Sequence, residues 1–548
     1  MIKRSLLAVT ISALGATSAH ASPYLPMDAR GLAMGSTGVA SAKRAHAPAY
    51  NPSLLSQAEH DDNFSLLLPA FGVVVADEDE IYDTFKDAND DLVPEFEALF
   101  EDNNSSNFNQ RLEDLDDAAD DLFDAVSALE NLNNGNRVQL GTNLETANNN
   151  FNQQLQELND ELTKVNSLTS DLSDALNSIS NSNIRGRFGA TAGLAFPGKS
   201  FAGAITLNTE VTFSGRAVYS PEDDNLLNAY GHALRDINEK GEDIGLIPEA
   251  EATSNTINAT ATTLKDPDQP LINAPQVVSL VDSVESIQNF SSSPVDTAAA
   301  QDIRIIENGV LSDAAEDPEL NSELEVLAVA VSDVSLSFSR EFAFGERKVA
   351  LGITPKLQKI TTFHYVTEAD NDDGIDRDEI EDQAEHFTQA NLDIGASFRL
   401  GSTNKWVVGV VGKNLIGKEF ETKDVPVRGG PDGLMASGQT ITLDPQWRAG
   451  VAFNGDITTL ALDVDLVEND PIAFEAPTQY AALGAEVDAW DFLQLRMGYR
   501  TNMSVADSDV VSVGLGLSFG AHLDLAVLAN PNDIKKEAGF AAELGFNF

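Results

Sequence analysis

From residue 324 onward the sequence consists of segments of about ten residues in which apolar and polar side chains alternate. In the last segment, Phe540, Leu544 and Phe548 share one face, because successive side chains of an extended chain point to opposite sides. A dyad repeat of this length is typical of transmembrane β-strands, which face lipid on one side and a lumen on the other. The pattern predicts an all-β membrane protein.

The connectors between these segments alternate between short and long. Residues 197–200 and 401–403 are short, whereas 216–323 and 414–440 are long. Bacterial barrels have short periplasmic turns and longer extracellular loops, and the count of roughly 14 segments is even, as that class requires. We therefore expect a roughly 14-stranded antiparallel outer-membrane β-barrel. A water-soluble sandwich is the alternative, but it does not require such regular alternation.

Residues 1–21 have the pattern of a signal peptide: Lys3 and Arg4 precede an apolar run at 6–14, and small residues around Ala21 fit a cleavage site. No later stretch has the roughly 20 uninterrupted apolar residues of a spanning helix. A membrane-embedded chain of this kind has to be a barrel. We expect export to the cell outer membrane of a Gram-negative bacterium, with outer-membrane lipid and the barrel assembly machinery as partners.

The mature chain begins with a glycine-punctuated segment, residues 22–58. Glycine permits close backbone approach and positive φ, and an Asn-Pro pair favours a turn. We expect this segment to fold as a compact plug inside the barrel. A dinucleotide-binding loop is excluded, because no strand precedes these glycines and no βαβ unit follows them. The residues expected to form the plug are Arg30, Gly31, Met34, Gly35, Gly38, Asn51 and Pro52.

The barrel region, 59–548, contains two large insertions. In the first, 77–183, apolar residues recur at spacings of three and four on either side of a sequence that favours a chain reversal, Asn133-Asn134-Gly135-Asn136. Heptad-like stripes of this kind predict an acidic, antiparallel helical hairpin of coiled-coil character, projecting outside the cell. The second insertion, 216–323, is predicted to be irregular with short helical patches. The pattern leaves open whether the hairpin binds a partner or is a self-paired, solvated arm.

Composition excludes several functions. The chain has no cysteine, so disulfides and thiolate sites are absent. Its formal net charge of −53 opposes binding to nucleic acid. The seven histidines form no pair at helical metal-binding spacing, and no motif indicates a catalytic nucleophile. We predict a protein that is not an enzyme and has no cofactor, metal site or nucleic-acid partner.

Charges of both signs occupy the predicted inward faces of consecutive strands. On the lipid face each would cost about 2–4 kcal/mol near the midplane, so the lumen is the expected location. They are Arg448, Asp463, Asp465, Glu486, Arg496 and Arg500. Both an ion-paired filling and a polar lining of a solute path fit this pattern. We further expect Arg30 to pair with one or more of the carboxylates of Asp463, Asp465 and Glu486.

Residues 28–35 and 47–53 resemble the N-terminal signature of the long-chain fatty-acid transporter superfamily of outer-membrane barrels, although Ser53 stands where alanine is usual. Further segments are similar to the TraF-type conjugal transfer proteins of the outer-membrane kind; these are residues 443–452, 460–466, 480–486 and 495–500. The TraF name is shared with a thioredoxin-like protein, but a chain without cysteine cannot be a CxxC oxidoreductase.

The resemblance implies an N-terminal plug and a barrel that passes or binds small, hydrophobic solutes, with a link to conjugal transfer. The alternative is a surface interaction or adhesion protein, in which the helical arm contacts a partner and the barrel is only an anchor.

Removal of Phe548 should impair outer-membrane assembly, because we expect the insertion machinery to read the aromatic residue that ends the last alternating strand. Heat-modifiable migration on a gel, folded against boiled, measures the assembled fraction. Asn547→Ala, which keeps the terminal aromatic, is the control. Equal folded fractions for the truncated and control proteins would contradict this assignment.

Overall fold

The protein is described by a computed structural model. The residues that the structure describes are 24–57, 64–77, 81–92, 94–95, 108–180, 182–198, 201–239, 246–291, 306–307, 310–311, 321–344, 347–368, 381–401, 403–426, 435–470, 472, 474–489 and 492–547. The predicted signal peptide, 1–21, and the predicted assembly signal, Phe548, lie outside them. The chain forms two compact units. The barrel unit comprises Met1–Tyr82, Asn181–Val218 and Glu323–Phe548, and the helical unit comprises Asp83–Ser180 and Tyr219–Ser322.

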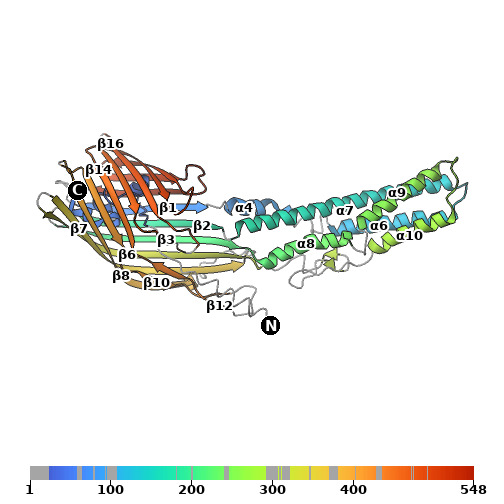
Figure 1. Ribbon diagram of the computed structural model, residues 1–548, viewed down its shortest axis with the longest axis horizontal. Helices are drawn as coiled ribbons and strands as arrows, with labels where there is room; N and C mark the ends of the chain where they lie inside the picture. Colours follow the sequence, from blue (N-terminus) through green and yellow to red (C-terminus); the bar gives the residue numbers. More distant parts are fainter. Residues whose placement is uncertain are drawn as a thin grey trace. The chain divides into compact units, whose positions relative to one another are not determined.

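The barrel unit is a closed, antiparallel cylinder of 14 strands (Figure 1), which confirms the predicted fold class. The first strand, β1, pairs with β2 on one side and with the last strand, β20, on the other, so the sheet has no free edge. In order around the barrel the strands are β1 Ser65–Asp77, β2 Asn183–Phe196, β3 Ala202–Val218, β6 Glu323–Phe344, β7 Arg347–Glu368, β8 Ala384–Leu400, β9 Trp406–Lys413, β14 Gln446–Asn454, β15 Thr458–Asp465, β16 Tyr480–Ala489, β17 Leu493–Asn502, β18 Val510–Ser518, β19 Ala521–Ala529 and β20 Ala538–Asn547.

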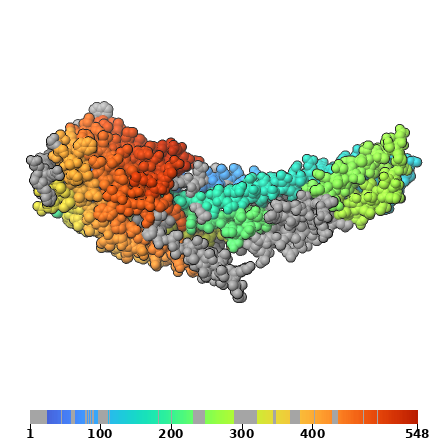
Figure 2. Space-filling model, in the orientation of Figure 1, coloured from blue at the N-terminus to red at the C-terminus, as the bar shows by residue number. Residues whose placement is uncertain are grey.

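Apolar and polar side chains are segregated between the two faces of the wall. On β15 and β16, Leu460, Leu462 and Leu483 are about half exposed on the outside, whereas Asp463 and Glu486 are almost fully buried inside. Residues from β14 onward form a continuous outer surface, orange to red in Figure 2. This is the arrangement of a barrel whose outer face meets lipid.

Aromatic pairs surround the end of the barrel where the connections are short. Each pair joins neighbouring strands, with ring centroids between 5.3 and 6.5 Å apart. The pairs are Phe64 with Phe196, Phe201 with Phe338, Trp406 with Phe453, and Phe492 with Phe519. Aromatic girdles mark the membrane interface of outer-membrane barrels, so the short-turn end of the wall carries one such boundary.

The strands differ greatly in length. β6 and β7 have 22 residues each, whereas β15 has 8. A strand needs about 9–11 residues to cross a membrane, so the long strands extend beyond it. Their extensions pack against two small sheets formed by β10 Lys418–Glu421, β11 Val425–Pro426, β12 Met435–Ala436 and β13 Thr440–Leu443. The connector predicted at 414–440 is therefore partly folded: Phe420 and Ile441 are buried against Leu327 and Ile360.

The helical unit has its own apolar core. Its main helices are α6 Phe108–Ser127, α7 Arg137–Ile179, α8 Pro221–Glu239, α9 Leu246–Lys265 and α10 Ala274–Ser291. Helix α6 packs on α7, α7 on α9, α9 on α10 and α10 on α6, and α8 packs on α7. The buried residues include Leu122, Phe151 and Ile257. The other elements of the two insertions are α4 Ile81–Asp87, η3 Ala88–Leu92, η4 Ala128–Asn131, β4 Ile306–Glu307 and β5 Val310–Leu311.

The second insertion is more ordered than its sequence suggests. Residues 216–323 were expected to be irregular with short helical patches, but α9 and α10 are full helices that complete a bundle with the hairpin of α6 and α7. Arg137 joins the insertions, since its guanidinium donates to the carbonyl oxygens of Thr263, Leu264 and Asp266. Among all helices described, none combines the length and apolarity that a bilayer crossing demands.

Phe151→Ala should destabilise the helical unit by about 3–5 kcal/mol, because Phe151 is fully buried in its core and the truncation leaves a cavity. Thermal unfolding followed by far-UV circular dichroism measures the change. Val138→Ala, on the exposed side of the same helix, is the control and should have little effect. Heat-modifiable migration should stay normal in both variants, since the barrel has a separate core. Equal destabilisation by the two substitutions would contradict the assignment.

Candidate functional site in the plugged lumen

The N-terminal segment folds into short helices that are almost completely buried inside the barrel unit. These are α2 Ala29–Ala33, η1 Arg44–His46, α3 Ala47–Tyr50 and η2 Pro52–Gln57. The Asp28 carboxylate caps α2: it accepts from the Gly31 N–H at 2.8 Å and from the Tyr50 hydroxyl at 2.6 Å. A Cβ at Gly31 or Gly38 would overlap the Tyr50 side chain, so both glycines are needed for this tyrosine to pack across the segment.

The plug backbone lies directly against the wall where the strands carry inward-facing glycines. Gly35 has a φ of +68°, and a Cβ added at Gly498 of β17 would lie 2.0 Å from its nitrogen. At Gly352 of β7, a Cβ would lie 2.4 Å from the carbonyl carbon of Pro52. Gly72, Gly409 and Gly484 are similarly close to plug carbonyl oxygens, those of Met27, Val39 and Met34. Met34, beside Gly35, is fully buried.

Asn51 is the hydrogen-bonding centre of the turn before η2. Its amide nitrogen donates to the Val39 carbonyl at 2.9 Å, and its side-chain oxygen accepts from the Ser53 hydroxyl at 2.7 Å. The Ser53 hydroxyl also lies 2.7 Å from that of Ser397 on β8. Ser53, which stands where alanine is usual, thus links the plug to the wall.

The Glu486 carboxylate forms ion pairs with three cationic side chains in the lumen. Arg30 Nε lies 3.0 Å from its carboxylate, Lys43 Nζ 2.9 Å and Arg496 Nε 2.7 Å. Arg30 and Glu486 are both almost fully buried, whereas the Lys43 side chain is 53% exposed. Of the three carboxylates expected to face Arg30, the structure brings Glu486 into contact with it.

The other predicted lumen charges are buried and have other partners. Asp463 accepts from the backbone N–H groups of Gly38 and Val39, at 2.7 and 3.0 Å, and so holds the plug through its main chain. Arg448 pairs with Asp465 on the neighbouring strand, and Arg496 pairs across β18 with Asp524. Arg500 of β17 pairs with Glu537, which directly precedes β20. On this side of the lumen the charges form an ion-paired filling.

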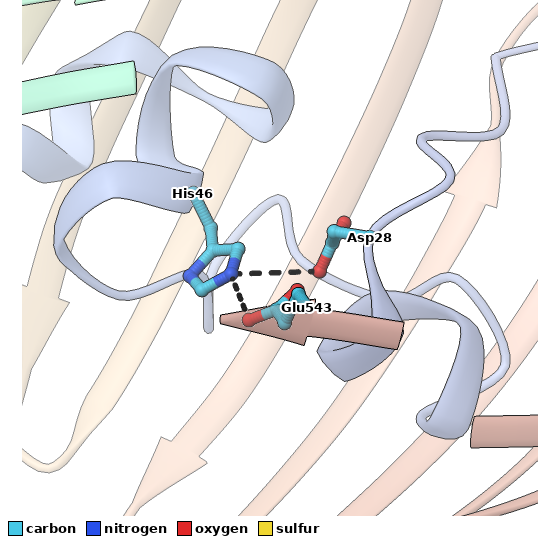
Figure 3. A group of neighbouring side chains, drawn as sticks. All are labelled: Asp28, His46 and Glu543. Carbon is cyan, nitrogen blue, oxygen red and sulfur yellow. Dashed lines mark hydrogen bonds and ion pairs between the residues drawn. The ribbon is translucent and has the colours of Figure 1, made fainter. Parts of the chain in front are cut away.

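Three residues that the sequence analysis did not single out meet where the plug touches β20. His46 Nε2 lies 2.8 Å from Glu543 and 3.8 Å from Asp28 (Figure 3). Burial lowers the pKa of His46, but the charge and hydrogen bond of Glu543 outweigh it and raise that pKa to about 9. The lumen position of Glu543 could have been predicted, because Glu543 lies between Ala542 and Leu544 in the same apolar/polar alternation as the other lumen charges. Asp28 and His46 lie in no such alternating segment.

A cavity of about 110 Å³ lies between the plug and strands β2, β3 and β6–β8. Its plug wall is mostly apolar, with Leu25, Pro26 and Met27, and its barrel wall is mostly polar. The polar wall comes from β3, β6, β7 and β8, and includes Thr206, Asn208, Thr212, Ser335, Lys356, Gln358 and Asp393. The Thr212 hydroxyl is buried and makes no hydrogen bond to any part of the chain that the structure describes.

The family of the chain follows from residues 48–465, which match the family described as "F plasmid transfer operon, TraF, protein". The matched region extends from the plug to the end of β15. The chain belongs to this family. The TraF family that the sequence resemblance predicted is therefore confirmed. Comparison with curated proteins gives no significant match.

Solved structures similar to the TraF-family chain include transporters and a channel. The Ralstonia pickettii toluene transporter TbuX is 9% identical, with 95% of this chain and 98% of that chain covered and a TM-score of 0.40. The Pseudomonas putida toluene transporter TodX is 9% identical, with coverages of 97% and 99% and a TM-score of 0.36. The CymD monoaromatic hydrocarbon channel is 10% identical, with coverages of 96% and 99% and a TM-score of 0.40.

Arg30→Gln should loosen the plug and raise single-channel conductance in planar bilayers. Breaking a buried ion pair costs about 3–5 kcal/mol, and Arg30 is almost fully buried against Glu486. Lys43→Gln is the matched control, because Lys43 contacts the same carboxylate from an exposed position where an ion pair contributes about 0–1 kcal/mol. Unaltered conductance in Arg30→Gln would show that this pair does not hold the plug.

Proposed function

We propose that this protein is an outer-membrane barrel that binds or passes a small, predominantly hydrophobic solute beside its N-terminal plug. The observation that carries the proposal is the cavity of about 110 Å³ between the plug and strands β2, β3 and β6–β8. Ligand sites are concave and mostly apolar, with a few polar groups that orient the ligand. Here the plug supplies the apolar wall and the barrel the polar one.

A buried hydroxyl in the polar wall of the cavity, without a hydrogen-bond partner among the described residues, supports this location. On the side of β3, the buried Thr212 hydroxyl points to a wall whose polar groups are not all used within the described chain. A solute with an apolar body and a polar end would satisfy both walls.

The proposal assigns the plug a gating role. The segment around Arg30, Gly35 and Asn51 is fixed by ion pairs, flush backbone contacts and hydrogen bonds, so solute passage past it requires a local rearrangement. A link to conjugal transfer is part of the proposal and rests on the family description, which names the F plasmid transfer operon.

Uptake and binding by the purified full-length protein in liposomes test the proposal, with a panel of fatty acids and other hydrophobic compounds. Thr212→Phe should reduce both, because it fills the cavity without removing a hydrogen bond between described residues. Val211→Phe, on the outward face of the same strand, is the matched control. Neither uptake nor binding of any compound by the unaltered protein would refute the proposal.

A second candidate is surface interaction through the helical unit. The observation that favours it is the separate core of that unit, which the barrel does not need. Because the bundle draws on both insertions, the deletion that tests it must remove 83–180 and 219–322 together. Lost mating or adhesion with retained uptake favours interaction, whereas the reverse favours transport.

A further inference from the structure

The contact between the plug and β20 contains a group of metal-ligating side chains, two of which also line the cavity. Asp28 precedes α2, His46 ends η1 and Glu543 lies on β20, so three separate segments contribute one side chain each. Their ligand atoms all lie within 4.8 Å of one another. Figure 3 shows the imidazole nitrogen directed towards both carboxylates.

We propose that Asp28, His46 and Glu543 bind one zinc ion, which fastens the plug to the barrel wall. Zinc takes nitrogen and oxygen ligands at about 2.0–2.2 Å in a tetrahedral arrangement, which separates neighbouring ligand atoms by about 3.3 Å. The separations from His46 Nε2, 2.8 Å to Glu543 and 3.8 Å to Asp28, lie on either side of that value. Shifts below 1 Å would complete the geometry.

The imidazole is already oriented for coordination. His46 Nδ1 lies 3.3 Å from the Lys43 carbonyl oxygen, which can only accept, so Nδ1 carries a proton and Nε2 is the atom that faces the carboxylates. A histidine ligand usually donates its other ring N–H to a carbonyl or carboxylate, which fixes its tautomer and orientation.

The two carboxylates are held in the same way. Asp28 accepts from the Gly31 N–H and the Tyr50 hydroxyl, and one oxygen of Glu543 accepts from the Ala29 N–H at 3.0 Å, which leaves the other directed at His46. Outer contacts of this kind maintain a ligand set in place before the metal arrives.

Charge, access and ligand type favour this ion. Two almost fully buried carboxylates face a single imidazole, so a dication compensates their charge better than a proton does. Asp28 and His46 also line the cavity, which gives the ion an entry path and leaves room for water as fourth ligand. Calcium takes six to eight oxygen ligands, so a site with one nitrogen and two carboxylates does not suit it.

Isothermal titration of the chelator-treated, full-length protein in detergent with Zn²⁺ tests the proposal. We expect saturable binding of one equivalent, which Ca²⁺ does not reproduce. His46→Gln should weaken it by more than the roughly 10–100-fold that outer contacts alone contribute. His386→Gln is the matched control, since this histidine is exposed on β8 and bonds to Thr361, and it should bind as the unaltered protein does.

Heat-modifiable migration establishes that each variant is folded. Should His46→Gln not fold, Glu543→Gln takes its place, and the visible absorption of the Co²⁺-loaded unaltered protein gives an independent result: intense tetrahedral bands support the site, and an octahedral spectrum overturns it. Absence of saturable Zn²⁺ binding, or equal weakening by His46→Gln and His386→Gln, would also overturn the proposal. None of these outcomes depends on which solute the barrel carries.

Discussion

The structure depends on one requirement: inside a bilayer, every backbone N–H and C=O must find a partner within the protein. Pairing of β1 with β20 meets it by removing the sheet edges. Closure then determines which side chains face inward, because the outer face must be apolar and the polar groups of the wall therefore point into the lumen. The charges in the lumen follow from the lipid outside, and each needs a counter-charge or a backbone donor. The plug supplies part of both, through Arg30 and through the main chain at Gly38.

Much of the wall could be predicted because a strand has a period of two and lipid imposes a strict difference between its faces. Alternation predicted the lumen side of Asp463 and Glu486, and counting the alternating segments gave roughly 14 strands. The same rule could not show where one sheet ends and another begins. Residues 441–454 alternate throughout, yet β13 and β14 belong to different sheets. Asp444 and Pro445 separate the two strands, and proline provides no N–H for a ladder.

Other features depend on contacts that no local pattern records. The cluster of Asp28, His46 and Glu543 joins residues about 500 positions apart, so spacing in the sequence contains no trace of it. In α9, threonine, serine and alanine separate the few apolar residues, and the helix is stabilised by packing on α7 rather than by a strong stripe of its own. The close approach of the plug to Gly352 and Gly498 could not be predicted from these residues alone. Both glycines face inward on their strands and leave room for the plug backbone.

The origin of the helical bundle in two insertions has a consequence for biogenesis. Its first half, α6 and α7, precedes β2, and its second half, α9 and α10, follows β3. During synthesis the first hairpin is complete more than 60 residues before α9 begins. Its apolar residues therefore stay exposed until α9 and α10 have been made. Two strands of the barrel are made within that interval and are likewise without most of their neighbours. The chain therefore passes through a period in which both units are unfinished and aggregation-prone. The bundle can be completed once α10 has been made, whereas the barrel can close only once β20 has been made.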